Sequence, residues 1–497
     1  MKKLRILSSI SKKKIWLLLF LGIVVAICIA LMVVRINRIP SWVLWTEKEI
    51  EVGTNKVILH GKKLEVRNSE GEVTFTADKS FKIQDVLVTD IDRDNEPEMI
   101  VLLWKRGIYG KHRPFWIRSD EKNYSQHIFL FDLNSDGTAA HKWGASETGI
   151  DVNRMKIMEK NDAILLVESI DGKSTLWTWD SWGLKILDNE VKFVAFGDNL
   201  IHAPIYEYAR AKEGGKFDFL YKPFLEDIQD ADIAALNAET VLVDKDTMVG
   251  GYPSFGSPME VGEAIAKAGF DVVSCANNHV LDRGVQGIDL SYSFYKENGI
   301  TCVGIQSSTD TEYRPYEVIS KNGMKIALLS YTYGTNMGDI SQKRPNMIHY
   351  LPRDIGDIED GADITDTDNL SEDEKKLLND LKEARKEADF VIVFAHWGRE
   401  YQKETDSFQE RMARIFALGG ADVVIGSHPH VVQKTELLDR PDGGKMLVYY
   451  SLGNFRADQG RREETRTGLE AVFTIGHVYD GVKLIDYSQK EIDAYWR

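Results

Sequence analysis

The sequence has few prolines, few cysteines and no excess of positive charge. Proline occurs at only 12 of 497 positions and hydrophobic residues make up 43%, so most of the chain can bury a core. At roughly 100–200 residues per domain, this length predicts two or three domains. The formal net charge of −15 argues against a nucleic-acid partner, which would favour a basic surface. It also argues against a broad basic groove for an acidic polymer.

Only three cysteines are present. Cys28 lies in an apolar run near the N-terminus, and Cys275 and Cys302 lie in predicted apolar strands. Outside the cell these last two could form a disulfide. The simpler interpretation is two buried thiols, because free cysteine behaves as a small apolar side chain.

One long apolar segment lies near the N-terminus. Residues 15–34 carry no charge, and about 20 apolar residues span a bilayer as a helix. Basic residues are denser in residues 1–14 than after the run, and the heavier basic flank stays inside the cell. We expect residues 1–14 to be cytoplasmic, residues 15–34 to form one transmembrane helix, and the rest to be extracellular. The alternative is a cleaved signal peptide, but its apolar region is shorter and no small-x-small cleavage site follows.

Residues 46–187 are expected to form a β-rich domain of propeller-like or sandwich-like units. Short runs with alternating apolar residues are separated by Gly, Asn and Asp turns, which is the strand pattern. One turn carries acids at alternate positions, the spacing with which calcium loops surround a hard ion with oxygen. Its acids are Asp90, Asp92, Asp94 and Glu98. The alternative is an Asp-rich turn without calcium.

From residue 192 to 497 apolar strands alternate with helical patterns, which predicts an α/β fold. Residues 354–374 form an acidic insert without a basic residue, typical of a solvated loop. Ser371 and Glu374 then have the spacing of a capping box, so a helix should begin there and run toward Ala388.

Polar residues that suit metal binding follow the predicted strands of this second region. Open α/β sheets place their sites at the carboxyl ends of strands, so these side chains should share one edge. They are Asp198, His202, Glu239, Asn278, His396, His428 and His430. Imidazole with carboxylate suits Zn, Mn or Fe, and the lack of cysteine argues against a structural zinc site. The set exceeds the needs of one ion, so we expect two divalent ions about 3.5–4 Å apart.

Six motifs, in order, resemble the bacterial capsule-synthesis family CapA/PgsA, a branch of the calcineurin-like metallophosphatases. They are GD at 197–198, NAE at 237–239, ANNHVLDRGVQG at 276–287, HWGREY at 396–401, GSHPHVVQ at 426–433 and SLGNF at 451–455. The resemblance covers residues 192–497. It implies a four-layer α-β-β-α sandwich with its metal site at the sheet edges. It also implies a role in making, exporting or anchoring poly-γ-glutamate.

The resemblance implies a role for each matching residue. Asp198, Asn278 and His396 match metal ligands, and the two histidines of the motif at 426–433 match ligands to different ions. The family's Asp-x-His has three intervening residues here, which leaves the place of His202 open. Glu239 stands in the region where a bridging aspartate is usual.

His279 matches the residue that acts near the leaving group, as a catalytic acid. Asp282 is either the residue that fixes its tautomer or an ordinary turn residue. Glu400 is interpreted as a local structural partner.

Three functions fit these residues. The first is a metal-dependent hydrolase or transferase at the cell surface, acting on poly-γ-glutamate or a phosphoester. The second is a non-catalytic subunit that works with membrane-bound polymer synthase or export subunits. The third is a general cell-surface phosphoesterase.

Overall fold

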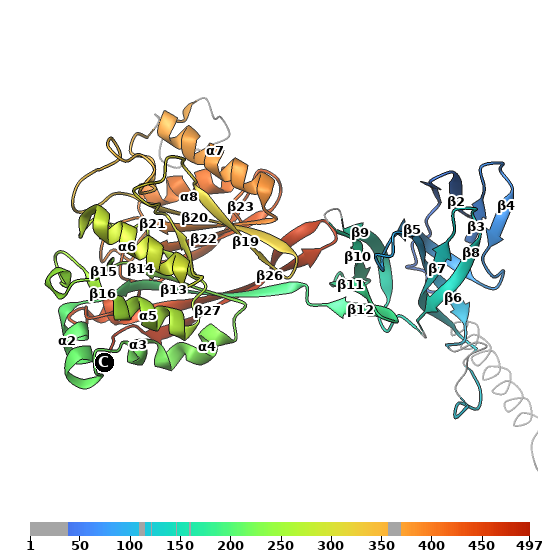
Figure 1. Cartoon of the computed structure of the whole chain (residues 1–497), viewed down its shortest axis with the longest axis horizontal. Helices are drawn as coiled ribbons and strands as arrows, with labels where there is room; N and C mark the ends of the chain where they lie inside the picture. The colour runs from blue at the N-terminus through green and yellow to red at the C-terminus, as the bar shows by residue number, and fades with distance from the viewer. Residues whose placement is uncertain (1–37, 109–114, 121, 146, 159–160, 356–368) are drawn as a thin grey trace, which may run out of the picture. The chain divides into compact units, whose positions relative to one another are not determined.

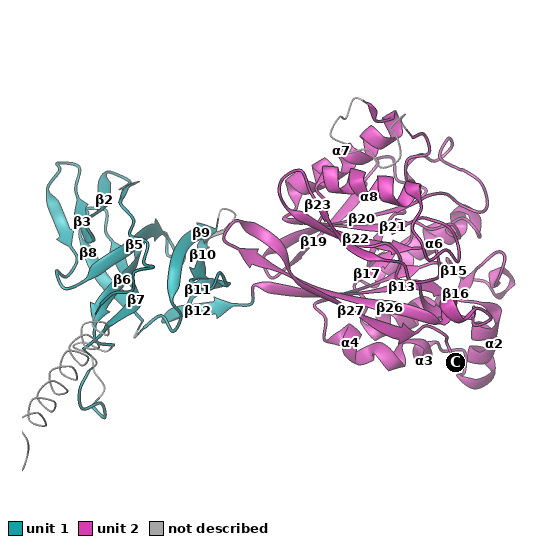
Figure 2. Cartoon of the chain, turned by 180° about the vertical axis from the view of Figure 1, so that it is seen from behind, with its two compact units in different colours: residues 1–188 teal, residues 189–497 magenta. Residues whose placement is uncertain are grey.

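The computed structural model describes residues 38–108, 115–120, 122–145, 147–158, 161–355 and 369–497. The chain divides into two compact units, residues 1–188 and 189–497 (Figure 2). The predicted cytoplasmic segment and transmembrane helix, residues 1–14 and 15–34, lie outside the described residues, as does most of the acidic insert. No helix within the described ranges is long and apolar enough to cross a bilayer.

Unit 1 consists of three antiparallel sheets, each built from four consecutive strands (Figure 1). The first sheet contains β1 Lys48–Val52, β2 Asn55–His60, β3 Lys63–Arg67 and β4 Val73–Thr76. The second contains β5 Lys82–Thr89, β6 Glu98–Arg106, β7 Tyr124–Leu133 and β8 Ala139–Gly144. The third contains β9 Val152–Met158, β10 Asn161–Ser169, β11 Ser174–Asp180 and β12 Gly183–Leu187.

The middle sheet is covered on both faces. Successive side chains of a strand point to opposite faces, and in β6 both sets are buried. Met99, Val101 and Leu103 pack with the first sheet, whereas Ile100 and Leu102 pack with the third. This explains why β6 is apolar throughout and not alternating.

A lysine from β8 reaches into the acidic turn before β6. The carboxylates of Asp90, Asp92 and Asp94 approach within 4.8 Å of one another, and Asn95 adopts the left-handed backbone that a tight turn needs, with φ 70°. The ammonium of Lys142 lies 2.5 Å from Asp92, and 2.7 and 2.9 Å from acids on β6 and β7, Glu98 and Asp132. The lysine therefore offsets part of the negative charge at the place where calcium is predicted, and the three acids of the turn still converge there.

Unit 2 has the α/β fold that the sequence predicted, with two mixed sheets. The first has the order β18-β17-β14-β13-β26-β27, and β25 also pairs with β13. Its strands are β13 Glu190–Leu200, β14 Ile233–Ala238, β17 Val272–Ser274, β18 Thr301–Val303, β25 Asn454–Ala457, β26 Thr467–Val478 and β27 Gly481–Asp493. The second has the order β19-β20-β21-β22-β24-β23. Its strands are β19 Tyr316–Lys321, β20 Met324–Thr332, β21 Phe390–His396, β22 Val423–Ser427, β23 Thr435–Asp439 and β24 Lys445–Tyr449.

Helices cover the outer faces of the two sheets (Figure 1). Five pack on the first sheet: α2 Ala203–Lys212, α3 Asp218–Tyr221, α4 Leu225–Gln229, α5 Met259–Ala268 and α6 Gly284–Glu297. Two pack on the second: α7 Glu372–Glu387 and α8 Ser407–Gly419. A third apolar cluster joins the sheets, with Phe193 and Phe473 from one and Ile326 and Ile392 from the other. A small pair, β15 Leu242–Val243 and β16 Ser257–Pro258, lies beside them.

Local signals explain where these helices begin and end. The predicted capping box is present: the hydroxyl of Ser371 accepts from the Glu374 N–H, and the Glu374 carboxylate accepts from the Ser371 N–H. Helix α7 ends before Ala388, as expected. Helix α8 ends at Gly420, whose φ of 89° is left-handed, the usual end of a helix.

Cys275 and Cys302 are buried free thiols and form no disulfide with each other. Their sulfur atoms lie 3.4 Å apart across neighbouring strands, so they pack as two small apolar side chains.

Candidate metal centre

The metal-competent side chains meet at the carboxyl ends of the parallel strands. Asp198 lies near the end of β13, Glu239 follows β14, and His396 ends β21. The loop after β22 supplies His428 and His430. All five side chains are at most 3% exposed, so they form one buried cluster although more than 200 residues of sequence separate the first from the last.

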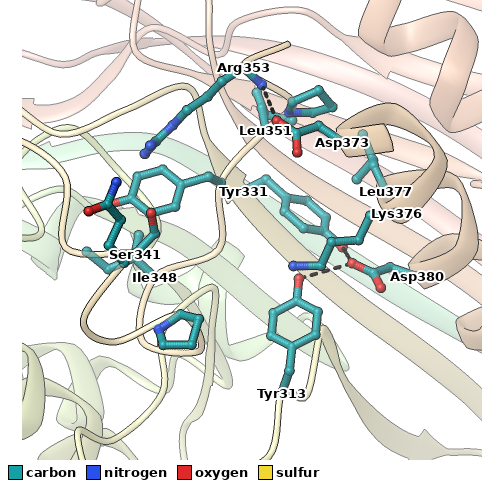
Figure 3. Close-up of a pocket in the computed structure, with 14 residues that line it drawn as sticks. Tyr313, Tyr331, Ser341, Ile348, Leu351, Arg353, Asp373, Lys376, Leu377 and Asp380 are labelled. Atoms are coloured by element: carbon teal, nitrogen blue, oxygen red, sulfur yellow. Dashed lines mark hydrogen bonds between the residues drawn. The ribbon is translucent and has the colours of Figure 1, made fainter. Parts of the chain in front are cut away.

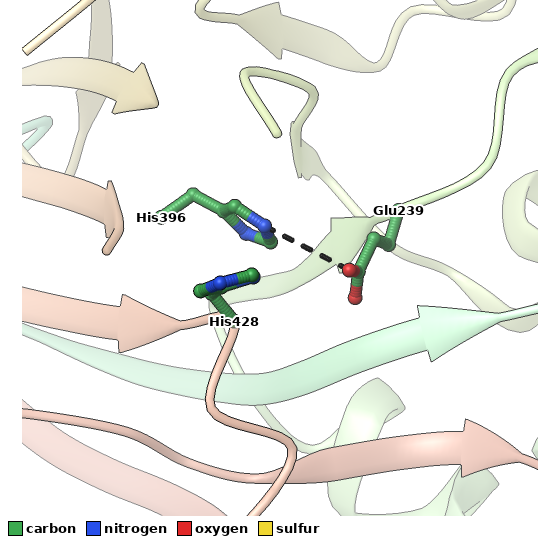
Figure 4. A group of neighbouring side chains, drawn as sticks. All are labelled: Glu239, His396 and His428. Carbon is green, nitrogen blue, oxygen red and sulfur yellow. Dashed lines mark ion pairs between the residues drawn. The ribbon is translucent and has the colours of Figure 1, made fainter. Parts of the chain in front are cut away.

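Two overlapping groups of three form within this cluster. Glu239, His396 and His428 offer ligand atoms within 4.8 Å of one another, and so do Asp198, Glu239 and His430. Figure 4 shows the Glu239 carboxylate facing the two imidazoles of the first group. Glu239 belongs to both groups, which is the position of a residue that bridges two ions.

Short contacts tie the groups together. Nδ1 of His430 lies 3.0 Å from the Asp198 carboxylate, and Nε2 of His396 lies 3.7 Å from that of Glu239. The side-chain oxygen of Asn278 lies 2.9 Å from Nε2 of His396, which brings this predicted ligand to the first group. The Asn237 amide donates to Asp198 over 2.8 Å and so orients that carboxylate.

The backbone is strained where it presents the last two histidines. His428 has a φ of 97° and His430 a φ of 58°. A left-handed backbone is uncommon for a residue with a side chain, and such strain, of order 1–3 kcal/mol, gathers at functional sites. The N–H of His428 points at the Asp198 carboxylate, at 3.3 and 3.4 Å from its two oxygens.

Burial sets the protonation of the cluster. Desolvation lowers the pKa of His428 to about 3 and holds that of His396 well below its ordinary value. Both imidazoles are therefore neutral at pH 7, with a lone pair free for a metal. Burial, followed by the negative charge of Asp198, raises the pKa of Glu239 well above that of an ordinary glutamate.

The cluster leaves polar atoms without partners. Both carboxylate oxygens of Glu239, Nδ1 of His428 and the side-chain oxygen of Asn237 are buried without a hydrogen bond. Such orphaned atoms are costly in a folded protein. The charges that act most strongly on Glu239, those of Asp198, Glu400 and Asp282, are all negative. Unpaired acceptors, neutral imidazoles and uncompensated negative charge together fit divalent cations.

His279 lies beside the cluster and is oriented by an acid. Its Nδ1 lies 2.7 Å from the Asp282 carboxylate, which also accepts from the Phe255 N–H over 2.7 Å. Asp282 thus serves both expected purposes, since it fixes the ring of His279 and organises a turn. With Nδ1 engaged, Nε2 is the ring atom that can exchange a proton.

Two candidates lie outside both groups. His202 is the residue before α2, where its Nδ1 lies 3.0 Å from the Leu200 carbonyl oxygen and 3.2 Å from the Asp458 backbone nitrogen, and its ring contacts Phe255. His202 is thus not one of the side chains that form the two groups of three, although His430 and His279 are among the groups that act on its pKa, and its role as a ligand stays a prediction. Glu400 is exposed and belongs to neither group.

Sequence reasoning missed the aromatic residues around the centre. The Tyr333 ring lies 4.7 Å from that of His428, and the Tyr401 ring lies 6.0 Å from that of His430. Asn336 approaches His279 at 3.5 Å. Tyr333 and Asn336 follow β20 in a loop without a recognisable motif, so no local signal identified them.

A separate cavity of about 410 Å³ lies on the α7 side of β20 (Figure 3). Tyr313 and Tyr331 both donate to the Asp380 carboxylate at its wall. The side chain of Ser330, the residue before Tyr331, points instead to Ser274 in the other sheet. None of the residues that line the cavity belongs to the metal-competent cluster, so the two are separate features.

A family model for "bacterial capsule synthesis protein PGA_cap" matches residues 192–459, more than half of the chain. The chain belongs to this capsule synthesis family. The resemblance carried by the six motifs is thus confirmed, and all five residues of the buried cluster fall inside the matched range.

Named relatives agree with this membership. The chain is 31% identical over 191 residues to the "PGA biosynthesis protein CapA" of Bacillus subtilis, covering 38% of this chain and 43% of that protein. It is 30% identical over 203 residues to the "capsule biosynthesis protein CapA" of Bacillus anthracis, covering 40% and 43%. The matched part is thus less than half the length of either relative.

Solved structures show only a distant similarity. A "novel phosphatase" from Mycoplasma pneumoniae has 16% identity and a TM-score of 0.36, covering 61% of this chain and 94% of that one. The "calcineurin-like phosphoesterase YfkN" from Bacillus subtilis has 15% identity and a TM-score of 0.30, covering 62% and 91%. Scores this low add nothing to the family membership.

Proposed function

We propose that unit 2 is a metal-dependent hydrolase or transferase that acts on a capsule polymer at the cell surface. The polymer class is poly-γ-glutamate, as the names of the Bacillus relatives suggest. The two sheets and their outer helices are proposed to be the four-layer α-β-β-α sandwich of the metallophosphatases. The observation that carries the proposal is the position of Glu239, shared by two groups of buried ligand atoms.

Two divalent cations, of Mn, Fe or Zn, would be held by this cluster. Asp198 and His430 would bind one, His396, His428 and Asn278 the other, and Glu239 both. Cations bound there would polarise a substrate oxygen and make a nearby water more acidic. The protein's part is to hold its imidazoles neutral by burial and to fix the carboxylates through Asn237.

His279 is proposed as the residue that protonates the leaving group. The 2.7 Å contact with Asp282 holds its ring and engages Nδ1, so Nε2 carries the proton to be transferred. The Asn336 side chain lies beside the same ring atom, at 3.5 Å. A positioned acid of this kind contributes typically about 10²–10⁴-fold in rate.

The direct test is turnover by the purified full-length protein. It is assayed for metal content and for hydrolysis of γ-glutamyl peptides and of phosphoesters, with Glu239→Gln beside it. We expect bound metal and γ-glutamyl cleavage in the wild type and loss of both in the variant. Bound metal with cleavage of phosphoesters alone would favour a general phosphoesterase. Bound metal without any turnover would favour a non-catalytic subunit of a polymer synthase or export complex.

The proposed location is the cell membrane, with a single pass through residues 15–34, the N-terminus inside and both units outside. The support is the uncharged run itself and its basic N-terminal flank. Protease added to intact cells should digest unit 2. Full protection in intact cells, with digestion after permeabilisation, would refute this topology.

A further inference from the structure

Unit 1 exposes an aromatic pair that the proposed function does not use. Phe115 is 95% exposed and Trp116 is 68% exposed, and their ring centroids lie 4.8 Å apart. Burying a large apolar side chain is worth about 1.5–3 kcal/mol. Two adjacent aromatic residues left in water therefore indicate a surface that covers them.

The pair lies on the one long connection inside a sheet of unit 1. Residues 107–123 join β6 to β7, whereas two residues suffice between β1 and β2 or between β11 and β12. Long connections in compact domains are usually either functional loops or linker segments. The base of this one is fixed, because the Gly107 N–H donates to the Asn123 carbonyl and the Ile108 N–H donates to Asp120. Hydrogen bonds thus hold the two ends of the connection that carries Phe115 and Trp116.

The same end of β6 receives the chain from the N-terminal apolar run. Trp42 packs edge-on against Trp104 at 5.9 Å, and Trp104 lies two residues before the end of β6. The apolar run ends at residue 34, so Trp42 lies at most about 29 Å of extended backbone from it. If residues 15–34 cross the bilayer, this end of β6 lies near the membrane.

The charge of the connection suits the same surface. Among the described residues, Arg106, Arg118 and Lys122 are exposed. Basic residues near a membrane are attracted to anionic headgroups by about 1 kcal/mol each, and tryptophan is enriched at the membrane interface.

We infer that Phe115 and Trp116 insert into the headgroup region of an anionic phospholipid surface. This inference rests on the proposed membrane location, since it supplies unit 1 with a second contact to the same bilayer. The connection between β6 and β7 would dock unit 1 on the membrane. It would limit the movement that unit 1 would have if residues 15–34 were its single attachment.

The test uses the full-length protein in vesicles of phosphatidylcholine and phosphatidylglycerol with brominated acyl chains, which quench nearby tryptophan. Trp116→Phe should remove part of the bromolipid-dependent quenching. The matched control is Trp182→Phe, because Trp182 is 82% exposed in the same unit but on the β11–β12 turn. It should leave the quenching unchanged. Quenching that is unaffected by Trp116→Phe, or reduced equally by both variants, would overturn the inference.

Alkaline carbonate extraction of the same vesicles tests the location separately. Release of the wild type would refute the transmembrane segment. The quenching is recorded before extraction. It therefore tests whether Phe115 and Trp116 insert into the headgroup region, whether or not the protein is then released.

Discussion

Glu239→Gln should be more stable than the wild type in chelator and less stable than the wild type when metal is added. In chelator the wild type buries Glu239 beside Asp198, with ligand atoms within 4.8 Å. At an effective dielectric of about 20, two charges at that distance repel by ~3.5 kcal/mol. The raised pKa of Glu239 reduces this cost by protonation. We therefore expect Glu239→Gln to be more stable than wild type in chelator, by about 1–2 kcal/mol.

With metal the order should invert. A cation at 100 times its Kd stabilises the native wild type by about 2.7 kcal/mol, which raises Tm by about 4 °C for a unit of this size. Glutamine cannot replace a carboxylate shared by two ions, so the variant should gain little. Thermal unfolding in EDTA and in a Mn²⁺, Fe²⁺ or Zn²⁺ series, followed by calorimetry, measures both effects.

A buried glutamate outside the cluster provides the control. Glu470 is 3% exposed and lies in β26 beside Lys490. Glu470→Gln should shift Tm by the same amount with and without metal. The reasoning about Glu239 is refuted if metal raises the Tm of Glu239→Gln as much as that of wild type. It is also refuted if the variant is the less stable protein in chelator.

Three further outcomes follow from the contacts described. His279→Ala should keep its metal but lose about 10²–10⁴-fold in turnover, whereas His430→Ala should lose metal by elemental analysis; metal loss in both would contradict the assigned roles. Lys142→Met should destabilise unit 1 by about 3–5 kcal/mol and make its Tm rise with calcium. Calcium should leave the wild type unchanged, and a rise in the wild-type Tm would show that the loop binds calcium with Lys142 in place. Burial lowers the pKa of His349 to about 3, so its contribution to stability is complete above pH 6.5 and is lost as the pH falls toward 3, by about 1.4 kcal/mol per unit. Denaturant titrations should show a shallower loss for His349→Gln, and equal slopes would contradict this.

The sequence predicted the cluster better than its surroundings. Each ligand was identified because it follows an apolar strand, and parallel strands carry such residues to one edge. Glu239 could be placed between two groups only once β14 was paired with β13. Lys142 is 44 residues from its partner Glu98 in the sequence, and no local sequence pattern predicts that a lysine will lie among the acids of this turn. The calcium expectation rests on spacing alone and stays a prediction, because the three acids do converge while Lys142 lies among them.

The left-handed backbones of His428 and His430 have an evolutionary consequence. Glycine adopts such a backbone without the steric cost that other residues meet, so the folded state by itself would favour glycine at both positions. Histidine persists there only while selection for its imidazole outweighs the strain. In a relative that had abandoned the centre, these two positions should drift to glycine or asparagine early, before the surrounding strands change. Their identity is thus a readable marker of whether a given family member still depends on this site.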